Sequence, residues 1–345
     1  MVQAIATAAA LLLLASTASA SPRTRRATLP DLNPVIATDF PDPSIIRVNT
    51  TWYAFASQSA FDFKNIKVQL ATSPDFQTWS LSPLDALSAA LPPWVDAPAG
   101  GTWAPSVSRR QDGKFLMYYS AVTNTGGGGR FHCVGAAVAD EVMGPYESNS
   151  DEPFACPVEK GGALDASAFI DPVDGGNYVL YKIDANALGH GGTCGNTVPP
   201  ILSTPIMIQR VDASDGVTKI GDPVEILTNT DLDGPLVEAP YMTRTKEGLY
   251  VLFFSSNCWT TELYDVSYAV SESPLGPFRK TMVPLAVTGT RGMIGPGGAS
   301  VAGDGEGGDE GYFALHGYAR RDDVGGRRAM FVGRVGYGDG GVEWV

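Results

Sequence analysis

Short runs of apolar and aromatic residues recur along the chain at nearly regular intervals. Such runs, bounded by turn residues, are typical of β-strands. The five runs are residues 51–57, 114–120, 177–182, 249–255 and 312–317. Aromatic anchors at positions 53, 115, 178, 250 and 313 are separated by 62, 63, 72 and 63 residues. A second strand-like run follows each one, at residues 67–71, 134–138, 206–209, 266–270 and 331–335. The pattern predicts five copies of one antiparallel β unit.

Each predicted unit is too small to bury both faces of its own sheet, so neighbouring units must pack against one another. Radial packing of such sheets gives a β-propeller, and no long helical periodicity competes with it. A β-sandwich or β-helix is the alternative. The strands of a sandwich reverse direction about every 8–12 residues, and a sandwich sequence shows no additional repeat of the length seen here. We therefore predict an all-β, five-bladed β-propeller, with loops from all blades gathered at one end of its axis.

Composition and charge narrow the class of partner. The 345 residues are 44% hydrophobic and 18% charged, with 40 Gly and 25 Pro, which excludes a disordered protein and suits a fold rich in turns. The formal net charge of -13 has the wrong sign for binding phosphate backbones or anionic lipid. We therefore expect no nucleic-acid or membrane partner, and a monomer that binds a neutral substrate.

Residues 1–20 have the features of a secretory signal peptide. An apolar stretch through residues 11–14 ends in small residues, with predicted cleavage after Ala20. No Lys or Arg precedes that stretch, and a disordered Ala-rich tail is the alternative. Residues 21–32 form an N-terminal segment in which Arg25–Arg26 is a candidate processing site or a solvated basic turn. The propeller is expected to span residues 33–345, and the protein to be secreted and extracellular.

Four cysteines fit an oxidising, extracellular compartment. Cys133, Cys156, Cys194 and Cys258 lack the C-x-x-C spacing of zinc and redox sites, so we expect disulfides. Three pairings are open by sequence. Pairing Cys133 with Cys156 closes a short loop and leaves Cys194 for Cys258, and this is the pairing that we favour.

Three acidic residues precede apolar strands at similar places in different units. Asp42 lies in DFPDPS, Asp165 in LDASAF and Glu238 in GPLVEAP. The second and fifth units have TWAPS (102–106) and GPGGAS (295–300) at the corresponding places. Each acid alone is explained by a turn or a solvated edge, since Asp beside Pro commonly caps local N–H groups. Their equivalent placement favours convergence at one mouth of the propeller.

Convergent carboxyl groups can hydrolyse glycosidic bonds. One ionised carboxylate activates a water molecule, and one protonated carboxyl donates its proton to the leaving oxygen. Glu238 has the longer side chain and is the candidate general acid, whereas Asp42, held between prolines, is the candidate general base. Asp165 is the candidate modulator of the acid, because crowded carboxyls raise one another's pKa.

The ordered series of motifs resembles that of glycoside hydrolase family 43. The motifs are Asn33-Pro34, DFPDPS at 39–44, WAP at 103–105, DASAF at 165–169, EAP at 238–240 and GPG at 295–297, and they cover essentially the whole mature chain. The resemblance implies a five-bladed propeller of inverting enzymes that act on arabinose- and xylose-containing polysaccharides. It also implies the same roles for Asp42, Asp165 and Glu238.

Two departures from the family pattern bear on metal binding. Ser106 stands where the family often has an acid, and Gly298 where it often has a histidine. Many relatives hold a cation on the propeller axis with the help of a histidine. We expect no required cofactor. For His316 there are two interpretations: a replacement ligand for a structural calcium ion on the axis, or a buried, hydrogen-bonded histidine.

Aromatic residues near the acids are candidate sugar platforms, because the C–H groups of a sugar face pack on a ring. The candidates are Phe40, Trp103 and Trp259, and the alternative for each is a place in the core between blades. His190, in a glycine-rich loop near Cys194, is a further pocket-lining candidate, or else part of a mobile surface loop.

The sequence as a whole predicts an inverting glycoside hydrolase that cleaves α-1,5-linked L-arabinofuranosyl bonds. Its expected substrates are arabinan and arabino-oligosaccharides of the plant cell wall. A β-xylosidase acting on xylo-oligosaccharides and a non-catalytic sugar-binding propeller are the alternatives. The sequence does not distinguish exo cleavage from endo cleavage.

Overall fold

The computed structural model describes residues 29–345 apart from 89, 127–130, 149, 304–308 and 339–340. Within that range, Asp31–Val345 belong to one compact unit. The predicted signal peptide (1–20) and the candidate processing site at Arg25–Arg26 lie outside the described residues. In the described part of the chain, no helix is both long and apolar enough to cross a membrane.

The described strands form five antiparallel four-stranded sheets, which we call blades 1–5. Blade 1 contains β1 (Ser44–Val48), β2 (Thr51–Ala56), β3 (Gln69–Ser73) and β4 (Ser80–Leu81). Blade 2 contains β5 (Thr102–Arg109), β6 (Phe115–Val122), β7 (His132–Ala139) and β8 (Glu147–Ser148). Blade 3 contains β9 (Ala163–Ile170), β10 (Asn177–Ile183), β11 (Ile206–Val211) and β12 (Val224–Leu227). Blade 4 contains β13 (Val237–Arg244), β14 (Tyr250–Ser256), β15 (Asp265–Ser271) and β16 (Arg279–Lys280). Blade 5 contains β17 (Ile294–Gly303), β18 (Glu310–Tyr318), β19 (Ala329–Gly338) and β20 (Gly341–Trp344).

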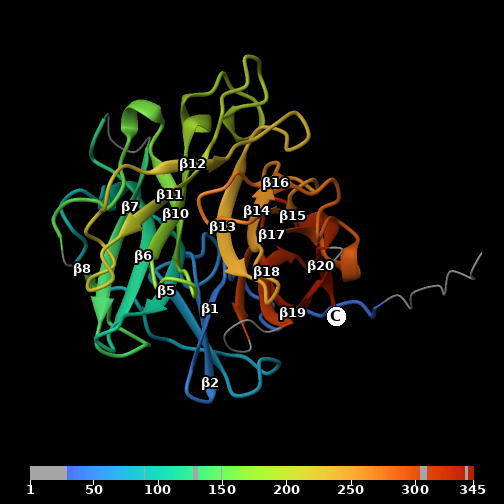
Figure 1. The fold of residues 1–345 in the computed structure, drawn as a ribbon, viewed down its shortest axis with the longest axis horizontal. Helices are drawn as coiled ribbons and strands as arrows, with labels where there is room; N and C mark the ends of the chain where they lie inside the picture. The colour runs from blue at the N-terminus through green and yellow to red at the C-terminus, as the bar shows by residue number, and fades with distance from the viewer. Residues whose placement is uncertain (1–28, 89, 127–130, 149, 304–308, 339–340) are drawn as a thin grey trace, which may run out of the picture. The chain divides into compact units, whose positions relative to one another are not determined.

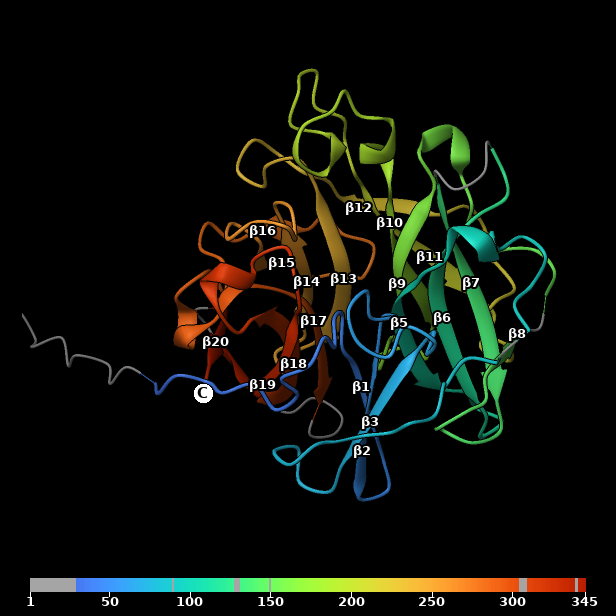
Figure 2. The ribbon, with the colours of Figure 1, turned by 180° about the vertical axis from the view of Figure 1, so that it is seen from behind.

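The five blades form a closed ring, from blade 1 in blue to blade 5 in red (Figure 1; Figure 2 from behind). The first strand of each blade contacts the first strand of both neighbouring blades, and β17 contacts β1. Each aromatic run of the sequence repeat is the second strand of its blade, and the later run is the third. The predicted all-β, five-bladed propeller is therefore confirmed.

Apolar clusters between successive blades hold the ring together. Aromatic and β-branched side chains dominate the second strands, where they pack well on a pleated, buried surface. The cluster that closes the ring joins Trp52 of blade 1 to Met330 and Val332 of blade 5. The ring centroids of Trp52 and Tyr312 lie 4.4 Å apart across this junction. No blade could bury both faces alone, so the ring is the folding unit.

Short 3₁₀ helices occur in the connections, and two disulfides bind connections to other parts of the fold. The helices are η1 (Ala97–Ala99), η2 (Val158–Lys160), η3 (Ala185–Leu188), η4 (Thr193–Gly195), η5 (Thr290–Gly292) and η6 (Arg321–Asp323). Disulfides join Cys133 to Cys156 and Cys194 to Cys258, the pairing favoured by the sequence. The long β10–β11 connection, which holds η3, η4 and Cys194, projects at the top of Figures 1 and 2.

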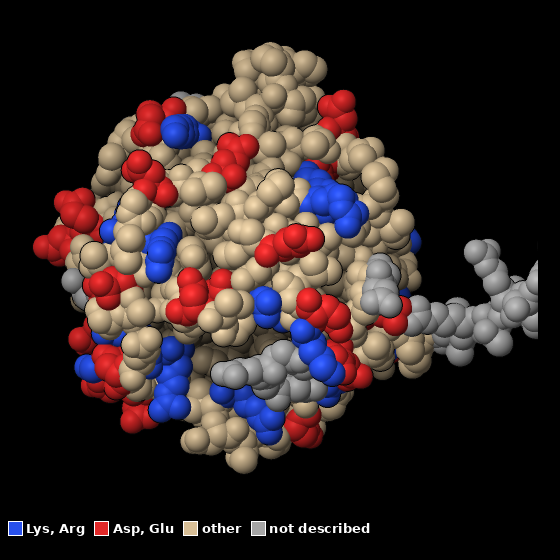
Figure 3. Space-filling model, viewed as in Figure 1, with Lys and Arg blue, Asp and Glu red and all other residues tan. Residues whose placement is uncertain are grey.

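Charged side chains are spread over the surface. Figure 3 shows Asp and Glu side chains interspersed with Lys and Arg over one face of the molecule. As far as its residues are described, this face carries no continuous basic surface of the kind that neutralises a phosphate backbone.

Candidate active site

One cavity of about 240 Å³ is lined by side chains from all five blades and their loops. The lining residues are Asp42, Trp103, Ser120, His132, Leu164, Asp165, Lys182, Asp184, Asn186, Cys194, Leu236, Glu238, Trp259, Tyr264 and Arg328. The three acids singled out in the sequence are among them, although they are far apart along the chain. The structure thus brings Asp42, Asp165 and Glu238 to one place.

A β-bulge in the first strand of blades 2 to 5, and the matching shift in pairing just before β1 of blade 1, direct these side chains. At each bulge, two residues of the first strand face one residue of the second, which bends the strand and redirects its side chains. The first of the two bulge residues has a positive φ; these are Asp42 (55°), Ala104 (46°), Asp165 (59°), Ala239 (51°) and Gly298 (57°). This left-handed conformation is disfavoured for most residues. All five residues line one smaller cavity together, so the bulges recur as a regular feature of the strands around the axis.

The acids do not all occupy the same bulge position. Asp42 and Asp165 are both the first bulge residue of their blades, whereas Glu238 immediately precedes the bulge residue Ala239. Glu238 is thus equivalent to Trp103 of blade 2, which also lines the cavity. This refines the expectation of equivalent placement: the cavity is lined from two adjacent positions, the bulge residue and the residue before it, and the acids use both.

Asp42 is surrounded by groups that favour its carboxylate form. Ser57 Oγ donates a hydrogen bond to Oδ2 at 2.5 Å, and Arg328 donates to Oδ1 at 3.3 Å. Burial opposes ionisation of Asp42, but the charge of Arg328 and the contacts with His316 and Ser57 hold its pKa well below the usual range. Asp42 is therefore ionised near neutral pH, as a general base must be.

Asp165 is in the opposite electrostatic setting. Its Oδ2 accepts the N–H of Ala239 at 2.9 Å, and its own N–H donates to Ser120 Oγ at 3.0 Å. Burial and the charge of Glu238 raise the pKa of Asp165 well above the usual range, and Lys182 offsets only part of this. The Asp165 carboxyl therefore keeps its proton at a pH at which a solvated aspartate would have lost it.

Both side-chain oxygens of Glu238 are held from within the protein. Lys182 Nζ donates to Oε2 at 3.0 Å, and the Tyr264 hydroxyl donates to Oε1 at 2.8 Å. Burial and the surrounding acids raise the pKa of Tyr264 well above its usual value, so its hydroxyl remains a donor. These contacts fix the direction in which the Glu238 carboxyl faces the cavity.

Two tryptophans lie on the cavity wall. The Trp103 ring meets His132 edge-on, with ring centroids 5.0 Å apart. The Arg328 guanidinium lies 4.6 Å from the centroid of the Trp259 ring. Both tryptophans and both partners line the cavity, so either ring can contact a bound molecule.

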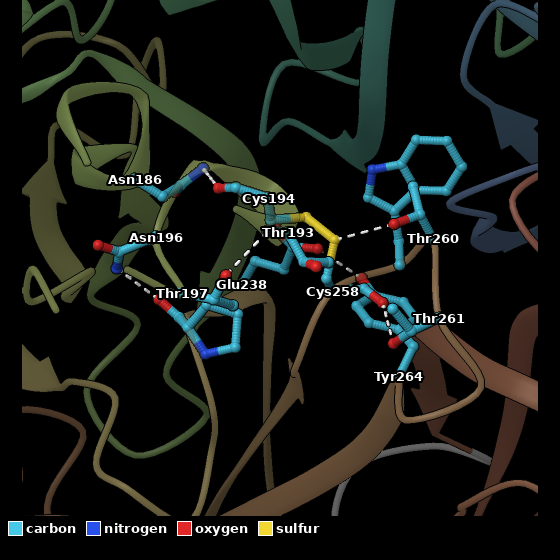
Figure 4. The surroundings of a disulfide bond; sticks show 12 residues. Asn186, Thr193, Cys194, Asn196, Thr197, Glu238, Cys258, Thr260, Thr261 and Tyr264 are labelled. Carbon is cyan, nitrogen blue, oxygen red and sulfur yellow. Dashed lines mark hydrogen bonds between the residues drawn. A yellow bond between two sulfur atoms is a disulfide. The ribbon is translucent and has the colours of Figure 1, made fainter. Parts of the chain in front are cut away.

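A disulfide forms part of the cavity rim. Figure 4 shows the Cys194–Cys258 bond between the β10–β11 connection and the loop after β14, with Glu238 and Tyr264 close by. Cys194 lines the cavity, and Trp259 follows Cys258 directly. Asn186 Nδ2 donates to the Cys194 carbonyl at 3.3 Å, which ties the bond to the η3 turn. The disulfide therefore fixes the loop that presents Trp259.

The model of glycosyl hydrolases family 43 matches residues 32–342, nearly the whole described chain. The chain belongs to this family. The resemblance expected from the motif series is therefore confirmed, and the cavity with its three acids is the candidate active site of a glycoside hydrolase.

Individual relatives of this family 43 chain carry different activities in their names. A β-D-galactofuranosidase of Aspergillus niger is 28% identical over 258 residues, which cover 72% of this chain and 66% of that protein. An extracellular endo-α-(1→5)-L-arabinanase of Thermotoga petrophila is 26% identical over 261 residues, 69% of this chain and 50% of that protein. A crystal structure of a thermostable family-43 glycoside hydrolase superposes with a TM-score of 0.74 at 27% identity, covering 91% of this chain and 95% of that one. The chain thus matches only part of the length of the two sequence relatives.

Two predicted sugar contacts lie elsewhere in this family 43 propeller. Phe40 is 0% exposed and packs in the cluster between blades 5 and 1, so it is a core residue and not a sugar platform. His190 is exposed on the β10–β11 connection and does not line the cavity. The physical reason is the disulfide, which brings Cys194 and not His190 to the rim.

His316 packs against Asp42. Its Nδ1 accepts the N–H of Asp42 at 3.0 Å, and its Nε2 is buried without a hydrogen-bond partner among the described residues. A Cβ added at Gly298 would lie 2.6 Å from the His316 ring, which therefore fills the space of the side chain that Gly298 lacks. Calcium takes about six to eight oxygen ligands, and no group of three or more His, Cys, Asp or Glu in the described residues could hold a metal. The side chains at His316 do not fit a calcium ion, and we assign no step to one.

Several residues of the site were missed in the sequence. Arg328 and Tyr264 stand in stretches without a strand-like pattern, so nothing marked them. Lys182 did leave a signal: it ends the apolar run 177–182 at a place where the runs of blades 1, 2 and 4 end in serine. A lysine at that register is a charged residue on a buried strand.

Proposed function

We propose that this family 43 glycoside hydrolase is a secreted, inverting enzyme that cleaves α-1,5-linked L-arabinofuranosyl bonds in arabinan or arabino-oligosaccharides of the plant cell wall. The observation that carries the proposal is the single cavity shared by Asp42, Asp165 and Glu238. The relative named as an extracellular endo-α-(1→5)-L-arabinanase supports the substrate. The two disulfides, together with that relative, support secretion.

Asp42 is the proposed general base. Its carboxylate accepts a proton from a water molecule, whose oxygen attacks the anomeric carbon on the face opposite to the leaving group. Ser57 and Arg328 fix the orientation of the carboxylate, and the lowered pKa keeps it ionised. Inversion follows because water attacks directly, without a covalent glycosyl-enzyme intermediate.

Glu238 is the proposed general acid. Its carboxyl transfers a proton to the glycosidic oxygen as the C–O bond breaks, so the leaving sugar departs as a neutral alcohol. Asp165 is the proposed modulator, because its buried carboxyl interacts electrostatically with Glu238, as the raised pKa of Asp165 indicates. The proposed steps use no metal or cofactor.

Trp103 and Trp259 are the proposed sugar platforms. Each ring lies on the cavity wall and can pack against the C–H face of a sugar. The cavity of about 240 Å³ is smaller than the roughly 300–1,000 Å³ typical of pockets for drug-sized ligands. It therefore suits a short stretch of saccharide, held at a neutral sugar ring.

Hydrolysis of D-galactofuranosyl bonds is a second candidate function. It is favoured by the Aspergillus niger relative, whose name is β-D-galactofuranosidase and which is 28% identical over 72% of this chain. Both candidates place a five-membered sugar ring in the cavity, so the same acids would serve either reaction.

Product analysis tests the proposal. The purified protein is incubated with linear arabinan, debranched arabinan, xylo-oligosaccharides and a galactofuranosyl oligosaccharide, and the products are separated by chromatography. Release of L-arabinose or short arabino-oligosaccharides is the expected result. Galactose release would favour the second candidate, and xylose release from xylo-oligosaccharides alone would contradict both.

The variant Glu238→Gln separates hydrolysis from sugar binding. Hydrolysis is expected to collapse while binding to the oligosaccharide, measured by calorimetry, persists. A variant that hydrolyses at the wild-type rate would remove Glu238 from the mechanism and leave a sugar-binding propeller as the better description.

A further inference from the structure

One position of the second strand recurs in every blade and contacts the next blade. The residue that pairs with the position just before the bulge is Ser57 (directly after β2), Ser120, Lys182, Ser255 or His316 in blades 1 to 5. In four blades it accepts a hydrogen bond from the bulge N–H of the following blade. These bonds are Ala104 N–H to Ser57 Oγ (2.8 Å), Asp165 N–H to Ser120 Oγ (3.0 Å), Gly298 N–H to Ser255 Oγ (2.9 Å) and Asp42 N–H to His316 Nδ1 (3.0 Å).

Blade 3 breaks this pattern with Lys182. An ammonium group has three donors and no acceptor, so it cannot take the N–H of Ala239. That N–H donates instead to Asp165 Oδ2 at 2.9 Å. A serine would complete the pattern without burying a charge, and burying a charge costs free energy unless it is paired. The lysine therefore occupies a position at which serine would satisfy the hydrogen bonding of the fold.

The charge of Lys182 is matched by acids of the cavity. Its side chain is 1% exposed, and its Nζ lies 3.0 Å from Glu238 Oε2 and 3.2 Å from Asp184 Oδ1. Burial opposes the charged form, but Glu238, Asp184 and Asp165 together raise the pKa of Lys182 above its usual value. Lys182 is thus a permanent buried cation beside the candidate acid.

A second contact anchors the cation from behind. Asp184, just after β10, holds Lys182 with Oδ1 and contacts His132 Nδ1 with Oδ2 at 3.0 Å. His132 in turn meets the edge of the Trp103 ring. The chain from Glu238 through Lys182 and Asp184 to His132 runs along one wall of the cavity, and all four residues line it.

We propose that Lys182 is a positioning residue for the glycosidase reaction, which holds the Glu238 carboxyl in line with the leaving oxygen and is itself held by Asp184. The inference rests on the proposed role of Glu238 as the acid. The proton that reaches the leaving oxygen comes from the Glu238 carboxyl, and the ammonium keeps its own three protons. After that transfer, Lys182 lies beside the carboxylate that Glu238 has become and stabilises its negative charge.

Leaving-group dependence separates this role from a merely structural one. A good leaving group, such as 4-nitrophenolate, departs without a proton, whereas a sugar alcohol needs one. The test variant is Lys182→Ser, which restores the residue found at this position in three other blades. It is assayed with the 4-nitrophenyl glycoside and with the disaccharide of whichever sugar the wild-type protein releases.

The variant Lys182→Ser is expected to keep a cooperative melting transition, because serine can accept the N–H of Ala239. Its kcat on the disaccharide should fall by at least about 100-fold, and its kcat on the aryl glycoside by less than about 10-fold. Lys182→Arg, which keeps the cation, should recover much of the lost activity. Lys280→Met serves as the matched control, since Lys280 bonds Thr228 O and Asp233 away from the cavity, and its kinetics should be unchanged.

Equal losses on both substrates, or no loss on either, would overturn the proposal. If Lys182→Ser did not fold, Asp184→Asn would replace it in the test, because this substitution weakens the contact that holds Lys182. The same leaving-group dependence is expected, with a smaller loss of activity. An equal loss of activity on both substrates would count against the positioning role. Added to Glu238→Gln, the Lys182→Ser substitution should cause no further loss of activity on the disaccharide.

The two proposals can fail separately. An active Glu238→Gln enzyme would contradict the role of Glu238 as the acid. An inactive Glu238→Gln enzyme together with a fully active Lys182→Ser enzyme would contradict only the positioning role of Lys182.

Discussion

Arg328 is the residue that most directly sets the charge of Asp42. Its guanidinium lies 3.3 Å from Asp42 Oδ1 and covers the Trp259 ring, so one side chain joins the proposed base to a proposed sugar platform. Asp42 is buried, and burial alone would favour the neutral acid. The arginine charge reverses that preference and keeps the base ready to accept a proton.

Replacing Arg328 by Met should therefore shift the acidic limb of the pH profile. Loss of a nearby positive charge raises the pKa of Asp42, so the base becomes protonated at a higher pH. We expect the acidic limb of kcat/KM to move upward by roughly one pH unit or more. Arg327→Met is the matched control, because Arg327 pairs with Asp62 outside the cavity. An acidic limb that stays in place would show that Arg328 does not govern the base.

Residues were predictable from the sequence where chemistry and repeat position coincide. Asp42, Asp165 and Glu238 each lie in a short motif before an apolar strand, and this placement correctly predicted that they converge at one cavity. Phe40 lies in the same motif as Asp42 but packs in the core, because the bulge turns only particular positions toward the axis. The unusual position of Lys182 could be recognised only by comparing the sequences of the blades with one another.

The bulges explain how the strands of a regular repeat can present different chemistry. All five have the same backbone conformation, yet the residue with positive φ is Asp, Ala or Gly. The strands were predictable from their aromatic runs, whereas the bulges were not, since no single residue type is common to all five of them. The conformation is imposed by tertiary hydrogen bonds from the preceding blade, as between Ala104 N–H and Ser57 Oγ.

The disulfide of the rim is expected to serve both stability and substrate binding. Cys194 and Cys258 are 64 residues apart, so their bond restricts a long loop of the unfolded chain. Replacing both by Ser should lower the free energy of unfolding by about 2–4 kcal/mol. It should also raise KM more than it lowers kcat, because the loop that presents Trp259 is released while the acids stay in place.

The Cys133→Ser, Cys156→Ser double variant is the control for this effect. That disulfide is not among the residues that line the cavity, so its loss should lower stability and leave KM unchanged. Equal effects of the two double variants on KM would mean that the rim disulfide has no particular role in binding.

Closure of the ring makes the propeller one cooperative structure. Blade 1 meets blade 5 through the cluster around Trp52, and all five blades contribute to the surroundings of the acids. The fivefold repeat predicted this closure. The sequence could not place the long connections, because their course depends on a disulfide and on contacts with other blades.

Replacing Trp52 by Ala should open the junction between the first and last blades. Trp52 is 3% exposed and contacts Phe76 and Tyr312. The expected loss in free energy of unfolding is about 3–5 kcal/mol, measured by denaturant titration as a single transition. Met282→Ala, at a side chain that is 81% exposed, is the control and should change stability by less than about 0.5 kcal/mol. Separate transitions for individual blades would contradict the view of the ring as the folding unit.

The stereochemical course of hydrolysis tests most directly whether Asp42 and Glu238 act together as base and acid on one sugar. Proton NMR of the anomeric signal is recorded during the first minutes of cleavage of an α-linked arabino-oligosaccharide. Direct attack by a water held on Asp42 predicts that β-L-arabinose units form first and then mutarotate. First appearance of the α-anomer would mean a covalent intermediate, and would contradict the assignment of Asp42 as a base.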